Sequence, residues 1–373
     1  MRGPGHPCRI KLRDYYAGRV MFMPYEQYED SIRLEKRTKA KENQFSPYCD
    51  FIYYESTRTP GIMLAARIIK PPKPSYIIAG THGWHMSIPK FVHMDQPQQG
   101  NDYLRVEVDM RGRAHSDGSP DCNGWELYDV IDAIEYVRKH YAEHIIDSDI
   151  VYFEAGSGGG GNSMAIVGKF PDYFAAATAL CGISDYALWY NNDEIGEFRD
   201  ELDVWIGTSP ADDPMAYRSR SGLTLVGNLL SPIFLAHGET DIRVPAEHTR
   251  LFAAKAEELG KSGLVRYLEL PGVGTRDHWG NATDEMMSVV RSESEENRIR
   301  HRSPVTLPSS GRLTVGGYLF TKPFSVVLDS SDKVAFLDYD LDAGKFELSC
   351  EVECGYTLTI GNESVSRQAS ILR

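Results

Sequence analysis

The chain has 373 residues, of which 42% are hydrophobic and 25% charged, and its formal net charge is −13. This balance is ordinary for globular proteins and excludes a mostly disordered or collagen-like chain, while the length allows two or three domains. The acidic charge repels phosphate backbones and argues against nucleic acid as a partner. No apolar run approaches the ~20 residues of a membrane span, and the first residues contain no apolar signal-peptide core. We therefore expect a cytoplasmic protein with no membrane partner.

The predicted elements divide the chain into three parts. Residues 1–48 are polar, basic and aromatic without a regular period, and they read as an N-terminal arm. In residues 49–300, short apolar runs alternate with amphipathic ones, which predicts a mainly parallel sheet flanked by helices. The expected strands are 51–56, 62–70, 75–80, 103–108, 149–155, 174–181, 232–237 and 265–270. The expected helices include 125–141, 163–170, 246–260 and 281–300.

A different pattern begins after residue 300. Short strand-like runs are divided by Gly, Ser, Asp and Pro with no helix between them, namely RLTVGGYLF, FSVVLD, KVAFLDYD, FELSCEVE and YTLTIG. This pattern predicts a small antiparallel β module over 301–373 with a core of its own. The run DYDLDAG resembles the start of a calcium loop, but Ala343 and Ser349 stand where such a loop needs Gly and Glu. We expect the aspartates to lie on a solvated strand face.

The cysteines predict no metal site and no disulfide framework. They are scattered and form neither a CxxC pair nor a Cys/His ligand spacing. We therefore expect free thiols, as in cytosolic proteins. The six are Cys8, Cys49, Cys122, Cys181, Cys350 and Cys354.

The clearest chemical signal is DIVYFEAGSGGGGNSM, in which an apolar strand ends in glycines and a helix follows. Ser157 stands at the strand-to-helix turn, where a nucleophilic serine needs small neighbours because its backbone is strained and crowded. Its neighbours are Ala155, Gly156, Gly158 and Gly159. A phosphate-binding loop is the alternative, but the segment lacks both the Lys-Ser/Thr ending and the G-x-G-x-x-G spacing. Ser163 is a rival nucleophile inside the expected helix.

A serine nucleophile needs a base, and the base needs an orienting acid. The segment SPIFLAHGETDIRVP places Asp241 just after an apolar strand, and VRYLELPGVGTRDHWG places His278 in a Gly-rich loop after the next one. Ser157, Asp241 and His278 thus follow three strand ends, where parallel sheets hold their ligand sites. We predict that they form a catalytic triad, with Glu239 as the second candidate for the acid.

The oxyanion that forms during acyl transfer needs preorganised donors. The N–H of Gly158 follows the nucleophile, and the N–H of Trp84 in the loop THGWH is our choice for the second donor. His82 and His85 in that loop are potential metal ligands, but no third ligand stands at a suitable spacing. We predict neither a metal nor a cofactor.

Five motifs together resemble the α/β-hydrolase superfamily, and within it the branch of prolyl-oligopeptidase-like catalytic domains and acyl esterases, including acetyl-ester hydrolases. The motifs are THGW, VDMRGRAHSDG, EAGSGGG, HGETDIRVP and the DHW loop. The resemblance spans about residues 50–290 and implies the α/β-hydrolase fold with a serine triad. Two features depart from the pattern: Ala155 replaces the first Gly of G-x-S-x-G, and Ala114-His115 replaces a small or Gly pair.

The resemblance also suggests roles for residues around the triad. Residues 182–222 are expected to form a partial lid whose aromatic rings either line a pocket or pack the lid on the body. Arg111 and Arg113 are expected to brace the fold through buried hydrogen bonds rather than to clamp a substrate. The predicted substrate-binding residues are Trp84, His85, Trp189, Tyr190 and Trp279.

We therefore expect a serine hydrolase that cleaves a carboxylic ester, such as an acetyl or other acyl ester on a small molecule or a carbohydrate. A small serine peptidase or aminopeptidase uses the same residues, but the ~50 residues before the first strand are too few for the propeller that such peptidases carry. An inactive binding scaffold is a third interpretation, against which the complete triad argues. Self-association into a homo-oligomer is left open.

Overall fold

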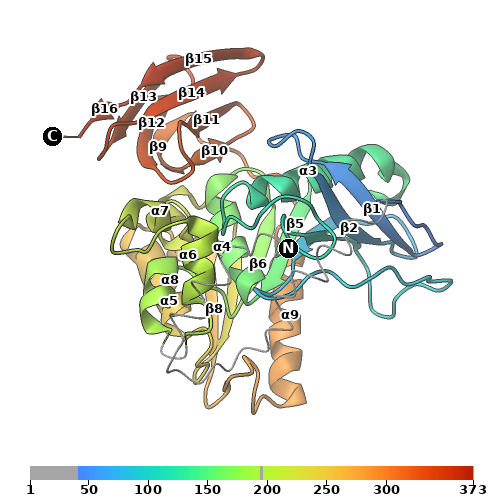
Figure 1. Cartoon of the computed structure of the whole chain (residues 1–373). Helices are drawn as coiled ribbons and strands as arrows, with labels where there is room; N and C mark the ends of the chain where they lie inside the picture. Colours follow the sequence, from blue (N-terminus) through green and yellow to red (C-terminus); the bar gives the residue numbers. More distant parts are fainter. Residues whose placement is uncertain (1–40, 194–195, 373) are drawn as a thin grey trace, which may run out of the picture.

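A computed structural model describes residues 41–193 and 196–372 (Figure 1). The predicted N-terminal arm lies outside these residues except for 41–48. The main sheet has eight strands in the order β1-β2-β4-β3-β5-β6-β7-β8. β1 pairs with β2, and β2 with β4, in antiparallel fashion, and the remaining pairs are parallel. The strands are β1 (Cys49–Glu55), β2 (Met63–Ile69), β3 (Ile77–Thr81), β4 (Leu104–Asp109), β5 (Val151–Gly156), β6 (Ala176–Leu180), β7 (Ile233–Gly238) and β8 (Val265–Leu270).

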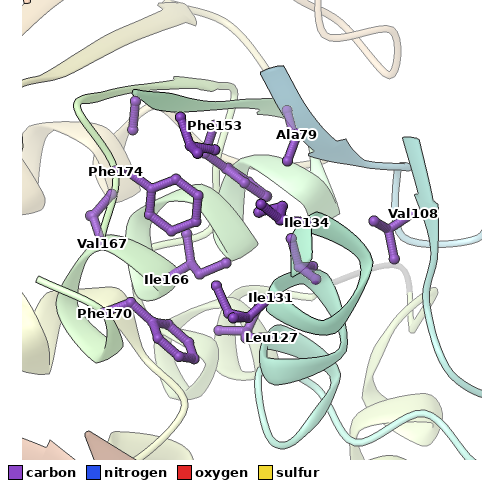
Figure 2. Close-up of a cluster of buried hydrophobic side chains, with 14 of the residues drawn as sticks. Ala79, Val108, Leu127, Ile131, Ile134, Phe153, Ile166, Val167, Phe170 and Phe174 are labelled. Atoms are coloured by element: carbon purple, nitrogen blue, oxygen red, sulfur yellow. The ribbon is translucent and has the colours of Figure 1, made fainter. Parts of the chain in front are cut away.

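This is the predicted α/β-hydrolase architecture, and each strand falls within two residues of its expected bounds at either end. The long helices are α3 (Glu126–His140), α4 (Gly158–Lys169), α8 (Glu247–Glu258) and α9 (Asp284–Arg300). Leu127, Ile131 and Ile134 of α3 recur at helical spacing and share one cluster with Phe153 of β5 and Ile166 of α4 (Figure 2). The shared core thereby holds α3 and α4 against the sheet. Shorter helical turns are η2 (Ala142–His144) and η4 (Ser262–Leu264).

Helix α4 begins five residues before its expected start. Four successive glycines, 158–161, form its first turn, although glycine is a poor helix former. An added Cβ at each of them would come within 2.8 Å of a heavy atom of the surrounding chain, so only glycines let this turn pack so closely. Tertiary packing overrides the local preference.

Between β6 and β7, where a partial lid was predicted, the chain forms short helices; this insertion is called the lid below, and its covering of the site stays a prediction. The helices are α5 (Tyr186–Asn192), α6 (Arg199–Ile206), α7 (Pro214–Arg218) and η3 (Gly222–Asn228). Asp185 caps α5 and Asp213 caps α7, each by accepting two backbone N–H groups. A cluster of aromatic and aliphatic side chains fills the space between these short helices and the loop that follows β3. The lid is therefore packed on the body.

The C-terminal residues form a second sheet in the order β15-β14-β11-β10-β9-β12-β13-β16. All its pairs are antiparallel except the two-residue pairing of β13 with β16. We expected one strand over RLTVGGYLF, but Gly317 at φ 71° turns the chain, so that β9 and β10 pair with each other. The strands are β9 (Ser310–Gly316), β10 (Tyr318–Phe320), β11 (Phe324–Leu328), β12 (Val334–Asp340), β13 (Lys345–Cys350), β14 (Gly355–Ile360), β15 (Glu363–Gln368) and β16 (Ser370–Ile371).

The C-terminal sheet, drawn in orange to red in Figure 1, has a core of its own and contributes Tyr318 to the main core. Tyr318 is fully buried among residues of the main body, stacks on Trp125 at a ring-centroid distance of 4.5 Å and donates a hydrogen bond to the Gly124 carbonyl. Lys169, at the end of α4, is buried against the ring of Tyr318 and donates to the Gly316 carbonyl. The sheet is thus anchored to α4, the helix that follows Ser157.

Two further sequence predictions are tested by these residues. The five cysteines that the structure describes are buried free thiols, as expected, whereas Cys8 lies outside the described chain. Within the two described ranges, none of the helices combines the length and the apolar character that a membrane span requires.

Candidate active site

Ser157 occupies the sharp turn between β5 and α4. Its backbone has φ 58° and ψ −123°, a conformation that non-glycine residues rarely adopt. The Ser157 N–H donates to the Leu180 carbonyl at 2.8 Å and its carbonyl accepts from Gly161 at 3.1 Å, so β6 and α4 hold the turn. This strained geometry is typical of a nucleophile elbow and lifts the hydroxyl clear of the sheet.

The structure brings the three predicted catalytic residues together. His278 Nε2 lies 2.8 Å from Ser157 Oγ, and His278 Nδ1 lies 2.6 Å from Asp241 Oδ2. Because a carboxylate accepts hydrogen bonds, Nδ1 carries the proton and the Nε2 lone pair faces the serine hydroxyl. Asp241 follows β7, His278 lies in the loop between β8 and α9, and both are therefore placed by strand ends.

Asp241 is fully buried and held from several sides. Its Oδ1 accepts the backbone N–H groups of Arg243 at 2.9 Å and Val244 at 3.1 Å. Burial alone would raise the pKa of this carboxyl, but hydrogen bonds from His237 and His278 lower it well below its ordinary value. Asp241 is therefore an anion that fixes the orientation of His278.

The predicted oxyanion donors lie next to each other. A Cβ added to Gly158 would stand 2.6 Å from the Trp84 backbone nitrogen, so the two backbones are in close contact. Neither N–H donates a hydrogen bond within the part of the chain that the structure describes. His82 steadies this loop, because its Nε2 accepts from the Met110 N–H at 3.1 Å and its Nδ1 donates to the Gly83 carbonyl.

The side chain of Trp84 points into the lid. Its ring lies 4.9 Å from that of Trp189 and 4.6 Å from that of Trp205, and 8% of the residue is exposed. Its Nε1 donates to Glu201 of α6, which also bonds His85 Nε2 at 3.0 Å. Burial raises the pKa of Glu201 well above its ordinary value and lowers that of His85, beside Arg113 and Arg243, to about 3. The buried carboxyl of Glu201 thus joins the loop that carries Trp84 and His85 to the lid.

A second lid carboxylate contacts the loops that carry the acid and the base. Glu197 lies 3.1 Å from Arg243, two residues after Asp241, and 3.9 Å from Arg276, two residues before His278. Neither Glu197 nor Glu201 was predicted from the sequence. The only signal for them was the acidic character of an aromatic-rich lid segment.

Three of the other predicted substrate-binding residues, His85, Trp189 and Tyr190, pack with the aromatic side chains of the lid. Trp189 is 2% exposed and donates its Nε1–H to the Arg243 carbonyl. His85 stacks on Phe198, and Tyr190 is half-buried with its hydroxyl 3.4 Å from Asp203. Trp279 packs against a separate cluster beside β7 and β8. Their predicted role in substrate binding stays a prediction.

The alternative candidates point elsewhere. Glu239 accepts the N–H of Gly272 at 2.8 Å and makes no contact with His278 within the described chain. Ser163 is buried in α4 and donates to the Gly159 carbonyl. Arg111 makes a two-pronged hydrogen bond with buried Asp129, at 2.6 and 2.7 Å, which is the bracing role expected from the sequence.

One cluster among residues 41–193 and 196–372 has the donor atoms for a metal ion. Atoms of Cys181, Asp241 and His278 lie within 4.8 Å of one another. Burial raises the pKa of the Cys181 thiol well above its ordinary value, and the Asp241 and His278 atoms are already bonded to each other. A cation there would have to break the hydrogen bond that orients the base.

Comparison with known proteins identifies the family. Residues 89–293 match the family described as "Prolyl oligopeptidase family". The chain belongs to this family. The match confirms the resemblance to prolyl-oligopeptidase-like domains seen in the sequence.

Relatives of this prolyl oligopeptidase family member include proteins named for different substrates. The chain is 26% identical over 151 residues to the "Uncharacterized peptidase YtmA" of Bacillus subtilis, covering 40% of this chain and 57% of that protein. It is 27% identical over 169 residues to the "Esterase LipQ" of Mycobacterium tuberculosis, covering 41% of this chain and 39% of that protein. The chain thus spans less than two thirds of either relative, and the two names leave ester and peptide substrates unresolved.

The fold is likewise that of a solved relative. The acylaminoacyl peptidase of Pyrococcus horikoshii superimposes with a TM-score of 0.51 at 20% identity, over 72% of this chain and 41% of the peptidase. At this identity the likeness supports the α/β-hydrolase fold alone.

Proposed function

We propose that this protein is a serine esterase that cleaves a carboxylic ester through an acyl-enzyme on Ser157. The observation that carries the proposal is the unbroken hydrogen-bonded chain from Ser157 Oγ through His278 to buried Asp241, with distances of 2.8 and 2.6 Å. Such a chain makes a serine hydroxyl nucleophilic near neutral pH, because the base is correctly oriented and the acid stabilises its charged form.

In the proposed reaction, Ser157 Oγ attacks the ester carbonyl while its proton passes to His278 Nε2. The oxyanion that forms accepts hydrogen bonds from the N–H groups of Gly158 and Trp84. The intermediate collapses, His278 returns the proton to the leaving alkoxide, and the acyl group remains on Ser157. Water then attacks the acyl-enzyme with His278 as base, which releases the acid and restores the serine.

An ester is the substrate that this arrangement supports best. An alkoxide leaves far more readily than an amine, so an ester demands less of His278 as a general acid. We propose a short acyl chain, such as acetyl, on a small alcohol or a carbohydrate. The rings of Trp189 and Trp205 pack against the ring of Trp84, beside the backbone N–H that we propose as an oxyanion donor. This filled space favours a short acyl chain over a long one.

A peptidase activity is the second candidate, and the match of residues 89–293 to the prolyl oligopeptidase family favours it. The test compares p-nitrophenyl acetate, butyrate and octanoate with aminoacyl p-nitroanilides. We expect turnover of acetate above octanoate and little of the anilides. Cleavage confined to the anilides would overturn the esterase proposal in favour of the peptidase.

Two variants make this test specific to the proposed nucleophile. Ser157→Ala should lower kcat by at least ~10³-fold, because the triad acts as a unit. Ser163→Ala is the matched control in the same glycine-rich segment, and it should retain most of the activity. A Ser157→Ala protein with unchanged turnover would refute the mechanism for both substrate classes.

A further inference from the structure

We propose that His237 and Thr249 are positioning residues that keep Asp241 charged and aligned on His278. This inference rests on the proposed function, in which Asp241 orients the base. His237 is the fifth residue of β7, lies four residues before Asp241 in the sequence and is fully buried beside it. Sequence analysis assigned it no role.

Three contacts define how His237 is held. Its Nε2 lies 2.8 Å from the Val244 carbonyl and 3.5 Å from Asp241 Oδ2. Its Nδ1 lies 2.7 Å from Oγ1 of Thr249, a residue of α8 whose exposure is 1%. Both ring nitrogens therefore have partners, and each partner comes from the turn or the helix that follows Asp241.

These partners select one tautomer of the ring. A carbonyl oxygen and a carboxylate oxygen can only accept, so Nε2 must carry a proton. In the neutral ring Nδ1 is then the acceptor, and it takes the hydroxyl proton of Thr249. Thr249 thus fixes the ring with its Nε2–H directed at Val244 and, more weakly, at Asp241.

Val244 couples this contact to the acid. Its carbonyl accepts from His237, while its N–H donates to Asp241 Oδ1 at 3.1 Å. His237 therefore braces the turn that presents Asp241 and also offers a donor to Oδ2, the oxygen that binds His278. Without that donor, more of the carboxylate's negative charge is directed at His278, and Asp241 is more easily protonated.

The expected consequence is a change in the acidic limb of the pH profile. A more basic Asp241 and a more basic His278 both move the loss of kcat/KM to higher pH. The titratable groups that face His237 are Asp241, His248 of α8 and Glu269 of β8. A merely structural role would lower the folded fraction or kcat without moving that limb.

The test uses two pairs of variants in the full chain. Thr249→Val keeps the shape but removes the hydroxyl, and Thr249→Ser restores it. His237→Phe removes both nitrogens, and His237→Gln keeps an N–H for the Val244 carbonyl. His248→Phe is the control, because His248 is an equally buried neighbouring histidine whose ring nitrogens have no hydrogen-bond partner in the described chain.

We expect Thr249→Val and His237→Phe to lower kcat for p-nitrophenyl acetate by ~10-fold, the size of a lost hydrogen bond to a charged group, with little change in KM. Their acidic limbs should move to higher pH, whereas the limbs of Thr249→Ser, His237→Gln and His248→Phe should stay near that of wild type. If His237→Phe does not fold, the isosteric Thr249→Val decides alone.

Labelling by a fluorophosphonate separates this inference from the proposed function. If wild type is not labelled at Ser157, the triad itself is wrong. If Ser157 is labelled but the limbs of Thr249→Val and His237→Phe coincide with that of wild type, the triad stands and the roles of His237 and Thr249 are refuted.

Discussion

Replacing Gly158 by alanine tests the oxyanion site by a change of one methyl group. The new Cβ would stand 2.6 Å from the Trp84 backbone nitrogen and 2.8 Å from its Cα, where ordinary contact begins at 3.4 Å. One backbone must therefore move by about 0.8 Å, because both neighbours are main-chain atoms that cannot rotate away. The donors must lie within about 2.7–3.1 Å of the oxyanion, so such a shift removes one of them.

The expected loss follows from the value of a single donor. Removing one oxyanion donor lowers kcat by about 10²–10³-fold, or about 2.7–4 kcal/mol of transition-state stabilisation. The assay is kcat and KM for p-nitrophenyl acetate, with thermal unfolding to confirm that the variant is folded. Gly227→Ala is the matched control, because its Cβ would meet nothing closer than 3.8 Å. A folded Gly158→Ala enzyme with wild-type kcat would refute the placement of the oxyanion site.

Three further predictions concern stability. Because the pKa of Asp241 is lowered in the folded state, its contribution to stability is complete well above the unfolded pKa of ~3.9 and is lost as pH falls from there toward the lower folded pKa. The Tm of wild type should therefore fall more steeply below about pH 5 than that of Asp241→Asn. Burial lowers the pKa of Lys169 to about 7, so the folded state holds fewer protons than the unfolded state between pH 7 and about pH 10. Wild-type stability should rise across that range, and a Lys169→Met protein with the same rise would contradict this. Tyr318→Ala should cost about 3–5 kcal/mol in urea unfolding, because the ring fills the joint between the C-terminal sheet and the main core, and a cost under about 1 kcal/mol would show that the joint is loose.

The strands of the main sheet were predicted well because each has a hydrophobic pattern that is typical of a strand. Each strand of the main sheet carries either an apolar run or, as in β4 and β8, apolar residues that alternate with charged ones, so periodicity and length were sufficient to find them. The start of α4 could not be found that way, because the glycines at 158–161 are helical only through their packing against β3, β6 and the lid. β15 was missed because all of its residues are exposed, which leaves no apolar alternation to detect.

The residues of the candidate site also differ in how far the sequence could predict them. Ser157, Asp241 and His278 were predictable because each follows a strand end in a recognisable local setting. His237 and Glu201 were not, because their roles depend on contacts across the fold: His237 with Thr249 twelve residues later, and Glu201 with Trp84 more than a hundred residues away. Such positions have no local signature, since a buried histidine in a strand or a glutamate in a helix is usually structural.

The same contrast applies to the C-terminal sheet. Its strand pattern predicted a module with its own core, and the structure has that core. The sequence could not indicate that Tyr318 is buried in the main body. The sequence pattern around a tyrosine in a strand is the same whether its ring packs on its own sheet or on a neighbouring one. Three-dimensional contacts alone place this ring against Trp125 and the Gly124 carbonyl.

The most direct test of the central claim is to find where a fluorophosphonate probe attaches. The probe reacts with a serine only when a base has activated it, so peptide mapping by mass spectrometry reads out the nucleophile itself. We expect one adduct per chain, on Ser157, and much slower labelling of Asp241→Asn, because that variant holds His278 in the wrong tautomer. An adduct on Ser163, or an absence of labelling in the folded wild-type protein, would contradict it.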